Sequence, residues 1–164
     1  MRVLGSSTAT WLSYGSFESL IQQASRKADW FCPQGNQGII QVSSIQKDSL
    51  GWHNFAIQAK RAASRAGFSD SHGWQLTASM VEIYTNIVEH SERVESGLIA
   101  YSAGSGYFDY AISDSGIGIL KSLRKNPKFS GLKDSGTALE LALGEGVSRH
   151  VESGRGMGFR AILV

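Results

Sequence analysis

The sequence predicts one domain of the α/β (α+β) class. Two amphipathic helical patterns, at residues 49–66 and 74–92, are followed by two strand patterns at 98–103 and 107–113. The chain has 164 residues, of which 41% are hydrophobic and 18% charged. These values are typical of a globular protein that is long enough to bury a core.

Charge and composition exclude several classes of function. The net charge of +2, from 16 basic and 14 acidic residues, gives no strong field for nucleic acid. We expect no signal peptide, since the first twelve residues have one positive charge and no sustained apolar run. No apolar run in the chain approaches the roughly 18 residues that would span a membrane. The single Cys32 cannot form an internal disulfide, and we interpret it as a buried apolar residue. We expect a cytoplasmic protein with no nucleic-acid or membrane partner.

Residues 1–47 are expected to form an N-terminal extension, a helix and a strand that could belong to the sheet. The strand is predicted from alternation at 38–45, and Pro33 ends the helix before it. The helix is predicted from apolar residues at helical spacing: Phe17, Leu20, Ile21, Ala24, Ala28 and Phe31.

The next two helices have clearer patterns. In the first, Asp48 or Ser49 is a candidate N-cap and Gly67 a candidate end. Its apolar positions are Trp52, Phe55, Ala56, Ala59, Ala62, Ala63 and Ala66. The second, residues 74–92, has an inward stripe of Thr77, Val81, Tyr84 and Val88. The two strands after it are joined by a hairpin turn at residues 104–106.

A long insert, residues 119–153, separates two glycine-rich segments, which is typical of a mobile flap. Two short helices are predicted in it, at 120–125 and 137–143. The apolar run 159–164 is interpreted as the first turns of a helix that the chain does not complete. We therefore expect the domain to be truncated at its C-terminus.

The first candidate functional residues are Glu82, Asn86 and His90, whose i, i+4, i+8 spacing places them on one helix face. A carboxylate can deprotonate a water or hydroxyl nucleophile, and an amide oxygen can complete the shell of a Mg²⁺. A histidine one turn further can donate to a phosphate oxygen. The alternative interpretation is a solvated face of an amphipathic helix.

The second candidate is Asp114 at the end of a strand, followed by Gly116 and Gly118. A carboxylate there can accept a hydrogen bond from the exocyclic amine of adenine, while the glycines let the backbone pass beneath the base. The alternative interpretation is an ordinary turn.

The third candidate is the segment GRGMG, in which backbone amides at a helix N-terminus would bind phosphates. Its residues are Gly154, Arg155, Gly156 and Gly158. The alternative is a flexible loop. The segment is not a Rossmann fingerprint, since no parallel strand precedes it, and no Gly-Lys-Ser/Thr of a P-loop is present.

In this order, the three segments resemble the motifs of the GHKL (histidine kinase-like) ATPases. These include gyrase, heat-shock chaperone ATPases, mismatch-repair ATPases, histidine kinases and anti-sigma serine kinases. EIYTNIVEHS is similar to their N box, DSGIG to the first glycine box and GRGMGF to the second. The resemblance covers residues 49–164. The short N box is most similar to that of the anti-sigma-factor serine kinases and related stand-alone bacterial domains.

The resemblance implies a two-layer sandwich, with a mixed, largely antiparallel sheet against a layer of helices. It implies that Glu82 is the catalytic base, Asn86 the Mg²⁺ ligand and His90 a phosphate neighbour. Asp114 would recognise adenine, with Gly116 and Gly118 bordering the base. Residues 119–153 would be the ATP lid, and Gly154, Arg155, Gly156 and Gly158 would support the phosphates.

We expect residues 48–164 to bind Mg-ATP and to transfer its γ-phosphoryl group to a protein serine or threonine, or to water, in bacterial regulation. One alternative is a non-catalytic module whose ATP-ordered lid controls a regulatory protein partner. Another is a fold that keeps the motifs without binding nucleotide. The insert's basic residues form either a triphosphate contact or a solvated face: Lys121, Arg124, Lys125, Lys128 and Lys133.

Overall fold

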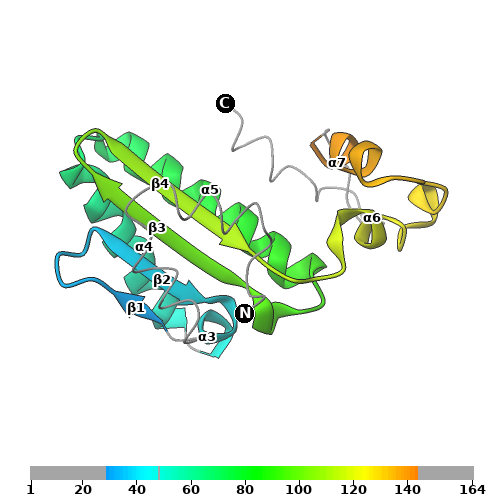
Figure 1. Cartoon of the computed structure of the whole chain (residues 1–164), viewed down its shortest axis with the longest axis horizontal. Helices are drawn as coiled ribbons and strands as arrows, with labels where there is room; N and C mark the ends of the chain where they lie inside the picture. Colours follow the sequence, from blue (N-terminus) through cyan, green and yellow to red (C-terminus); the bar gives the residue numbers. More distant parts are fainter. Residues whose placement is uncertain (1–28, 48, 144–164) are drawn as a thin grey trace.

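Residues 29–47 and 49–143, described by a computed structural model, form a two-layer α+β arrangement (Figure 1). A four-stranded sheet is one layer, and the two long helices α4 and α5 cover one of its faces. In chain order the elements are β1 (Trp30–Phe31), β2 (Gln37–Gln41), α3 (Val42–Lys47), α4 (Ser49–Arg65), α5 (Asp70–His90), η1 (Val94–Ser96), β3 (Leu98–Gly104), β4 (Tyr107–Ser113), α6 (Gly118–Leu123), η2 (Pro127–Phe129) and α7 (Ser135–Leu143). The predicted helix-and-sheet fold class is confirmed.

The sheet has the order β1-β2-β3-β4, and each neighbouring pair is antiparallel. The predicted hairpin is confirmed as β3 and β4. Its turn contains Gly106 at φ +76°, a conformation that glycine adopts without steric cost. The Gly106 N–H donates to the carbonyl of Ala66 at 2.9 Å, which fixes the turn to the end of α4. The described strands contain no parallel pair of the kind expected in a mixed sheet.

The strand predicted over residues 38–45 is wrong beyond Gln41, because α3 begins at Val42. Val42 and Ile45 are both buried in the core. In a strand, side chains three positions apart would point to opposite faces of the sheet, whereas in a helix they share a face. The helical turn therefore brings both side chains to the same core.

The helix predicted over residues 17–31 lies mostly outside the described residues, but its last two residues form strand β1 instead. Phe31 pairs with Gly38 of β2, where a Cβ atom would lie 2.9 Å from the Phe31 ring and 2.7 Å from the Tyr101 ring. The glycine leaves room for the two aromatic rings, and this long-range packing places Phe31 in the sheet.

Helix α4 follows the prediction at its C-terminal end. Gly67 has φ +101° and its N–H donates to the Ser64 carbonyl, while the Phe68 N–H donates to Ala63. These two bonds form the Schellman arrangement that commonly ends helices at glycine. Phe68 also packs against the core, so the residue that completes the cap also attaches the C-terminal end of α4 to the core.

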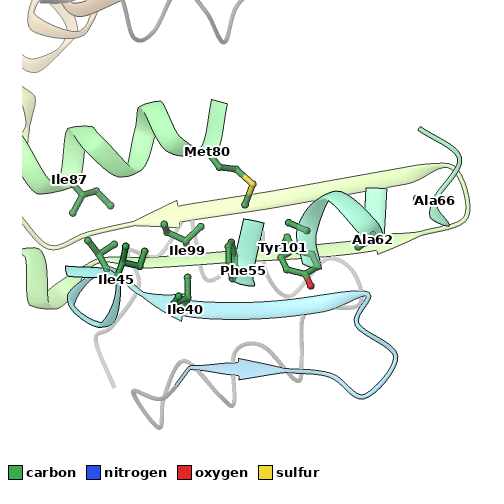
Figure 2. Close-up of a cluster of buried hydrophobic side chains, with 12 residues drawn as sticks. Ile40, Ile45, Phe55, Ala62, Ala66, Met80, Ile87, Ile99 and Tyr101 are labelled. Atoms are coloured by element: carbon green, nitrogen blue, oxygen red, sulfur yellow. The ribbon is translucent and has the colours of Figure 1, made fainter. Parts of the chain in front are cut away.

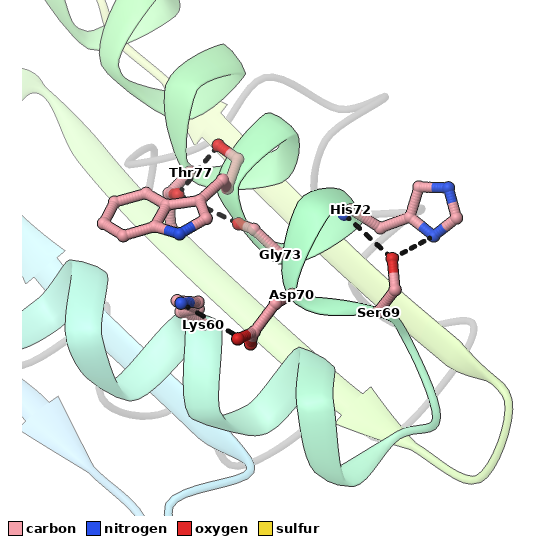
Figure 3. A network of polar contacts seen from close by, with 7 residues as sticks. Lys60, Ser69, Asp70, His72, Gly73 and Thr77 are labelled. Atoms are coloured by element: carbon pink, nitrogen blue, oxygen red, sulfur yellow. Dashed lines mark hydrogen bonds and ion pairs between the residues drawn. The ribbon is translucent and has the colours of Figure 1, made fainter.

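Helix α5 begins four residues earlier than predicted because Ser69 caps it, its hydroxyl accepting from the His72 N–H at 3.2 Å (Figure 3). Asp70 in its first turn lies 3.5 Å from Lys60 Nζ on α4, and the same ammonium lies over the Trp74 ring, 4.4 Å from its centroid. These contacts join the N-terminal end of α5 to α4.

The prediction of which residues of α5 face inward is partly wrong. Val81 is 36% exposed, and Met80, which is fully buried, occupies the core position instead. A shift of one residue turns a helical side chain by about 100°, so only one of the two can face the sheet. Thr77 is buried as predicted, and Tyr84 and Val88 pack against the core.

The core lies between the helices and the sheet (Figure 2). The Phe55 ring meets Tyr101 edge-on, with centroids 5.3 Å apart, and Trp52 stacks on Tyr84 at 5.4 Å. Burial raises the pKa of the Tyr101 phenol above its ordinary value. The cluster comprises Ile40, Val42, Ile45, Phe55, Ala59, Ala62, Ala66, Met80, Ile87, Ile99, Tyr101 and Ala103.

The two short helices predicted in the insert are confirmed as α6 and α7, which pack on each other beyond the end of β4 (Figure 1). Asp134 caps α7, since its Oδ1 accepts from the Thr137 N–H at 2.9 Å. Within residues 29–47 and 49–143, no helix has both the length and the apolar character needed to cross a bilayer.

Candidate functional site

The candidate site is built where the end of α5 meets the loop after β4. The Ile117 N–H donates to the Ser91 carbonyl at 2.9 Å, and Ser91 directly follows His90. The Asp-x-Gly-x-Gly loop is thereby fixed against the residue that follows the polar triple. Two of the three sequence motifs are brought together in this way.

Glu82, Asn86 and His90 occupy the last three turns of α5, and each is partly buried. The helix is continuous to His90, so the predicted i, i+4, i+8 face is present. Asn86 Nδ2 is buried and has no hydrogen-bond partner among the described residues. His90 Nε2 lies 3.9 Å from a carboxylate oxygen of Glu89.

Asp114 is exposed at the end of β4, and its Oδ1 accepts a hydrogen bond from the Gly116 N–H at 2.7 Å. This bond closes a tight Asx turn, in which the side chain takes the place of a backbone acceptor. One carboxylate oxygen is thus held by the loop.

The two glycines of the loop meet different requirements. At Gly116, a Cβ atom would collide with the Ser91 carbonyl and lie 2.6 Å from Asp114 Oδ1, so glycine permits the close approach to α5. Gly118 begins α6 at φ +77°, a left-handed conformation with open space around it. Neither glycine is replaceable by a larger residue without strain.

The connector, defined as residues 91–97, holds the loop. Apart from Ser91, which ends the segment EIYTNIVEHS, its residues were not identified from the sequence. The Ser115 N–H donates to Ser96 Oγ at 2.9 Å. Glu92 is the one non-glycine residue with positive φ, +58°, in the part of the chain that the structure describes. Residues 92–97 carry no recognisable motif, so the contact between Ser96 and the loop becomes visible only in the folded chain.

Two of the basic residues in the insert are engaged in contacts. Arg124 Nε donates to the Leu132 carbonyl at 2.7 Å, and Lys125 forms an ion pair with Glu92. Lys121, Lys128 and Lys133 are exposed. The ion pair of Lys125 joins the insert to the connector, just after the end of α5.

The second glycine-rich segment, with Gly154, Arg155, Gly156 and Gly158, lies outside the described residues, as do residues 144–153. Among the described residues, no three His, Cys, Asp or Glu side chains converge as a metal cluster. Comparisons of the chain with protein-family models, curated proteins and solved structures gave no match. The functional interpretation therefore depends on the residues and their geometry.

Proposed function

We propose that this chain binds Mg-ATP beside the end of α5 and transfers its γ-phosphoryl group to a protein serine or threonine, or to water. The observation that carries the proposal is the fixed contact between Ser91 and the loop after Asp114. A polar helix face and an Asp-x-Gly-x-Gly loop are held together there, in the order expected of a GHKL ATPase. A cytoplasmic setting, where ATP is available, is part of the proposal.

Adenine recognition is assigned to Asp114. Because Gly116 N–H holds Oδ1, the other carboxylate oxygen is left to accept from an exocyclic amino group. Gly118, with open space around the position of a Cβ atom, adds no side chain that would obstruct a flat base, and Gly116 lets the loop lie close to α5. The bonded oxygen also orients the carboxylate before the base arrives, which lowers the entropy cost of binding.

Asn86 is assigned to Mg²⁺. Buried polar groups are normally paired, so the Asn86 amide nitrogen, a buried donor with no partner among the described residues, is an exception that a phosphate oxygen of the bound nucleotide would explain. Its amide oxygen is a suitable hard donor for a magnesium ion that keeps water and phosphate as its other ligands. The bound ion would neutralise charge on the phosphates.

Glu82 is assigned as general base. Its carboxylate would take the proton of the acceptor hydroxyl as that oxygen forms a bond to the γ-phosphorus. The bond from the γ-phosphorus to the bridging oxygen breaks, and ADP leaves with that electron pair. Most of the rate enhancement in phosphoryl transfer comes from such positioning and charge neutralisation.

The first test is calorimetric titration with a non-hydrolysable ATP analogue, with and without Mg²⁺. Asp114→Asn should weaken binding by roughly 10- to 100-fold, because a hydrogen bond to a charged group contributes about 1.5–3 kcal/mol. Asp109→Asn is the matched control, since Asp109 is an exposed aspartate on β4, the strand that Asp114 follows. A folded wild-type chain that binds no analogue would contradict the proposal.

A second candidate function is a non-catalytic module whose ATP-ordered insert binds a regulatory protein. Leu139 and Leu143 favour it, because they share one face of α7 and are 48% and 38% exposed. Large apolar side chains that gather on a surface are common at protein interfaces.

Glu82→Gln separates the two functions. If the chain is an enzyme, turnover should fall by roughly 10²- to 10⁴-fold, the usual contribution of a general base, while analogue binding is retained. Glu95→Gln, at an exposed glutamate in η1, is the control. Equal turnover in wild type and Glu82→Gln would remove the role of Glu82 as base and favour the binding module.

A further inference from the structure

Three consecutive backbone amides in the loop after Asp114 are all hydrogen-bonded. The Ser115 N–H donates to Ser96 Oγ at 2.9 Å, the Gly116 N–H to Asp114 Oδ1 at 2.7 Å, and the Ile117 N–H to the Ser91 carbonyl at 2.9 Å. The two outer bonds both end on the connector. The turn that holds the Asp114 carboxylate is therefore fixed on each side.

The connector is itself ordered by its serines. The Arg93 N–H donates to Ser91 Oγ at 3.1 Å, and Ser96 Oγ donates to the Arg93 carbonyl at 2.7 Å. Because the Ser96 hydroxyl donates its proton to the Arg93 carbonyl, the Ser96 oxygen accepts from the Ser115 N–H through a lone pair. Ser96 thus has a fixed donor role and a fixed acceptor role.

We propose that Ser96 is a positioning residue for adenine, acting through the Ser115 amide on the Asp114 carboxylate. The inference rests on the function proposed above. Of the two outer bonds, the one to Ser91 uses a backbone carbonyl, so the bond to Ser96 is the one that a side-chain substitution removes. The distance between Ser96 and Ser115 in the chain is 19 residues, which explains why no local motif indicates this role.

Ser96→Ala should leave the Asx turn closed but held on one side only, because Gly116 still bonds Asp114 and Ile117 still bonds Ser91, while Ser115 loses its acceptor. The affinity for an adenine nucleotide should fall by roughly 2- to 10-fold, which corresponds to one hydrogen bond between neutral groups. The affinity for inorganic tripolyphosphate, which has no base, should not change. Ser96→Thr keeps a hydroxyl and should restore nucleotide affinity.

The experiment combines calorimetry with amide hydrogen exchange on the full chain. Wild type, Ser96→Ala, Ser96→Thr and Ser105→Ala are titrated with a non-hydrolysable ATP analogue and with tripolyphosphate. Ser105 is a suitable control because it is an exposed serine in the hairpin turn at the other end of β3 and β4. Exchange at the Ser115 amide is followed without nucleotide, so the anchor is measured independently of binding.

The inference is supported if Ser96→Ala loses both Ser115 protection and nucleotide affinity while tripolyphosphate affinity is kept. It is overturned if Ser96→Ala loses protection but binds the analogue as wild type does, or if both ligands weaken equally. A wild-type chain that binds no analogue removes the proposed function, and this inference with it. That failure is distinguishable, because it is seen before any variant is compared.

Discussion

At the residue scale, the site depends on how closely the loop approaches α5. Gly116 lies where a Cβ atom would meet the Ser91 carbonyl and the Ser91 side chain. The loop and the helix end share the bond from Ile117 to Ser91. A single methyl group is therefore enough to separate the two halves of the proposed site.

Gly116→Ala should lower the free energy of unfolding by roughly 1–3 kcal/mol, as overpacking of a close contact does, and should abolish nucleotide binding. Chemical denaturation measures the first effect and calorimetry the second. Gly131→Ala is the control, because a Cβ atom there has open space around it. Equal stability of the two variants would show that the loop is not held against α5.

At the element scale, α5 has two roles. Its inward face contributes Met80 and Ile87 to the core, while Glu82, Asn86 and His90 lie on its last three turns. The Ser69 cap and the contacts between Lys60 and Asp70 fix its start, and Ser91 fixes its end to the loop. A helix anchored at both ends holds the three side chains at constant spacing.

Helix α7 gives a pH prediction. The Thr137 N–H, followed by the Thr137 hydroxyl, lowers the pKa of Asp134 below the ordinary value of an aspartate. Since the pKa in the folded state is depressed, the cap is fully present above the ordinary pKa and is lost as pH falls through the folded value.

An NMR titration of the Asp134 carboxyl should therefore give a midpoint below the ordinary aspartate pKa of about 3.9. Thr137→Ala removes the hydroxyl but keeps the backbone donor, so the titration midpoint of Asp134 should rise part of the way toward the ordinary aspartate value. A wild-type midpoint at or above the ordinary value would show that Asp134 does not cap α7.

At the scale of the whole molecule, the sheet and the long helices form a framework, and α6 and α7 extend beyond the end of β4 (Figure 1). The framework shares one buried cluster drawn from β2, β3, α3, α4 and α5. The proposed site lies at the boundary between this framework and the insert. There the Lys125–Glu92 ion pair links the insert to the connector, two residues after the end of α5.

The sequence by itself determined the elements whose signals are local. Helix α4, the hairpin and the two insert helices follow from periodicity, caps and turn residues, which act within about four neighbouring residues. The spacing of Glu82, Asn86 and His90 on one face follows in the same way.

Only the tertiary structure decided which apolar residues face the core and how the site is held. Met80 rather than the predicted Val81 faces the core, and a helix rather than the predicted strand begins at Val42. Both outcomes depend on packing against strands that are distant in the sequence. The bonds from Ser115 to Ser96 and from Ile117 to Ser91 form because the β3–β4 hairpin returns the chain to the end of α5. Local propensity holds no information on such contacts, since they arise between segments that meet only after folding.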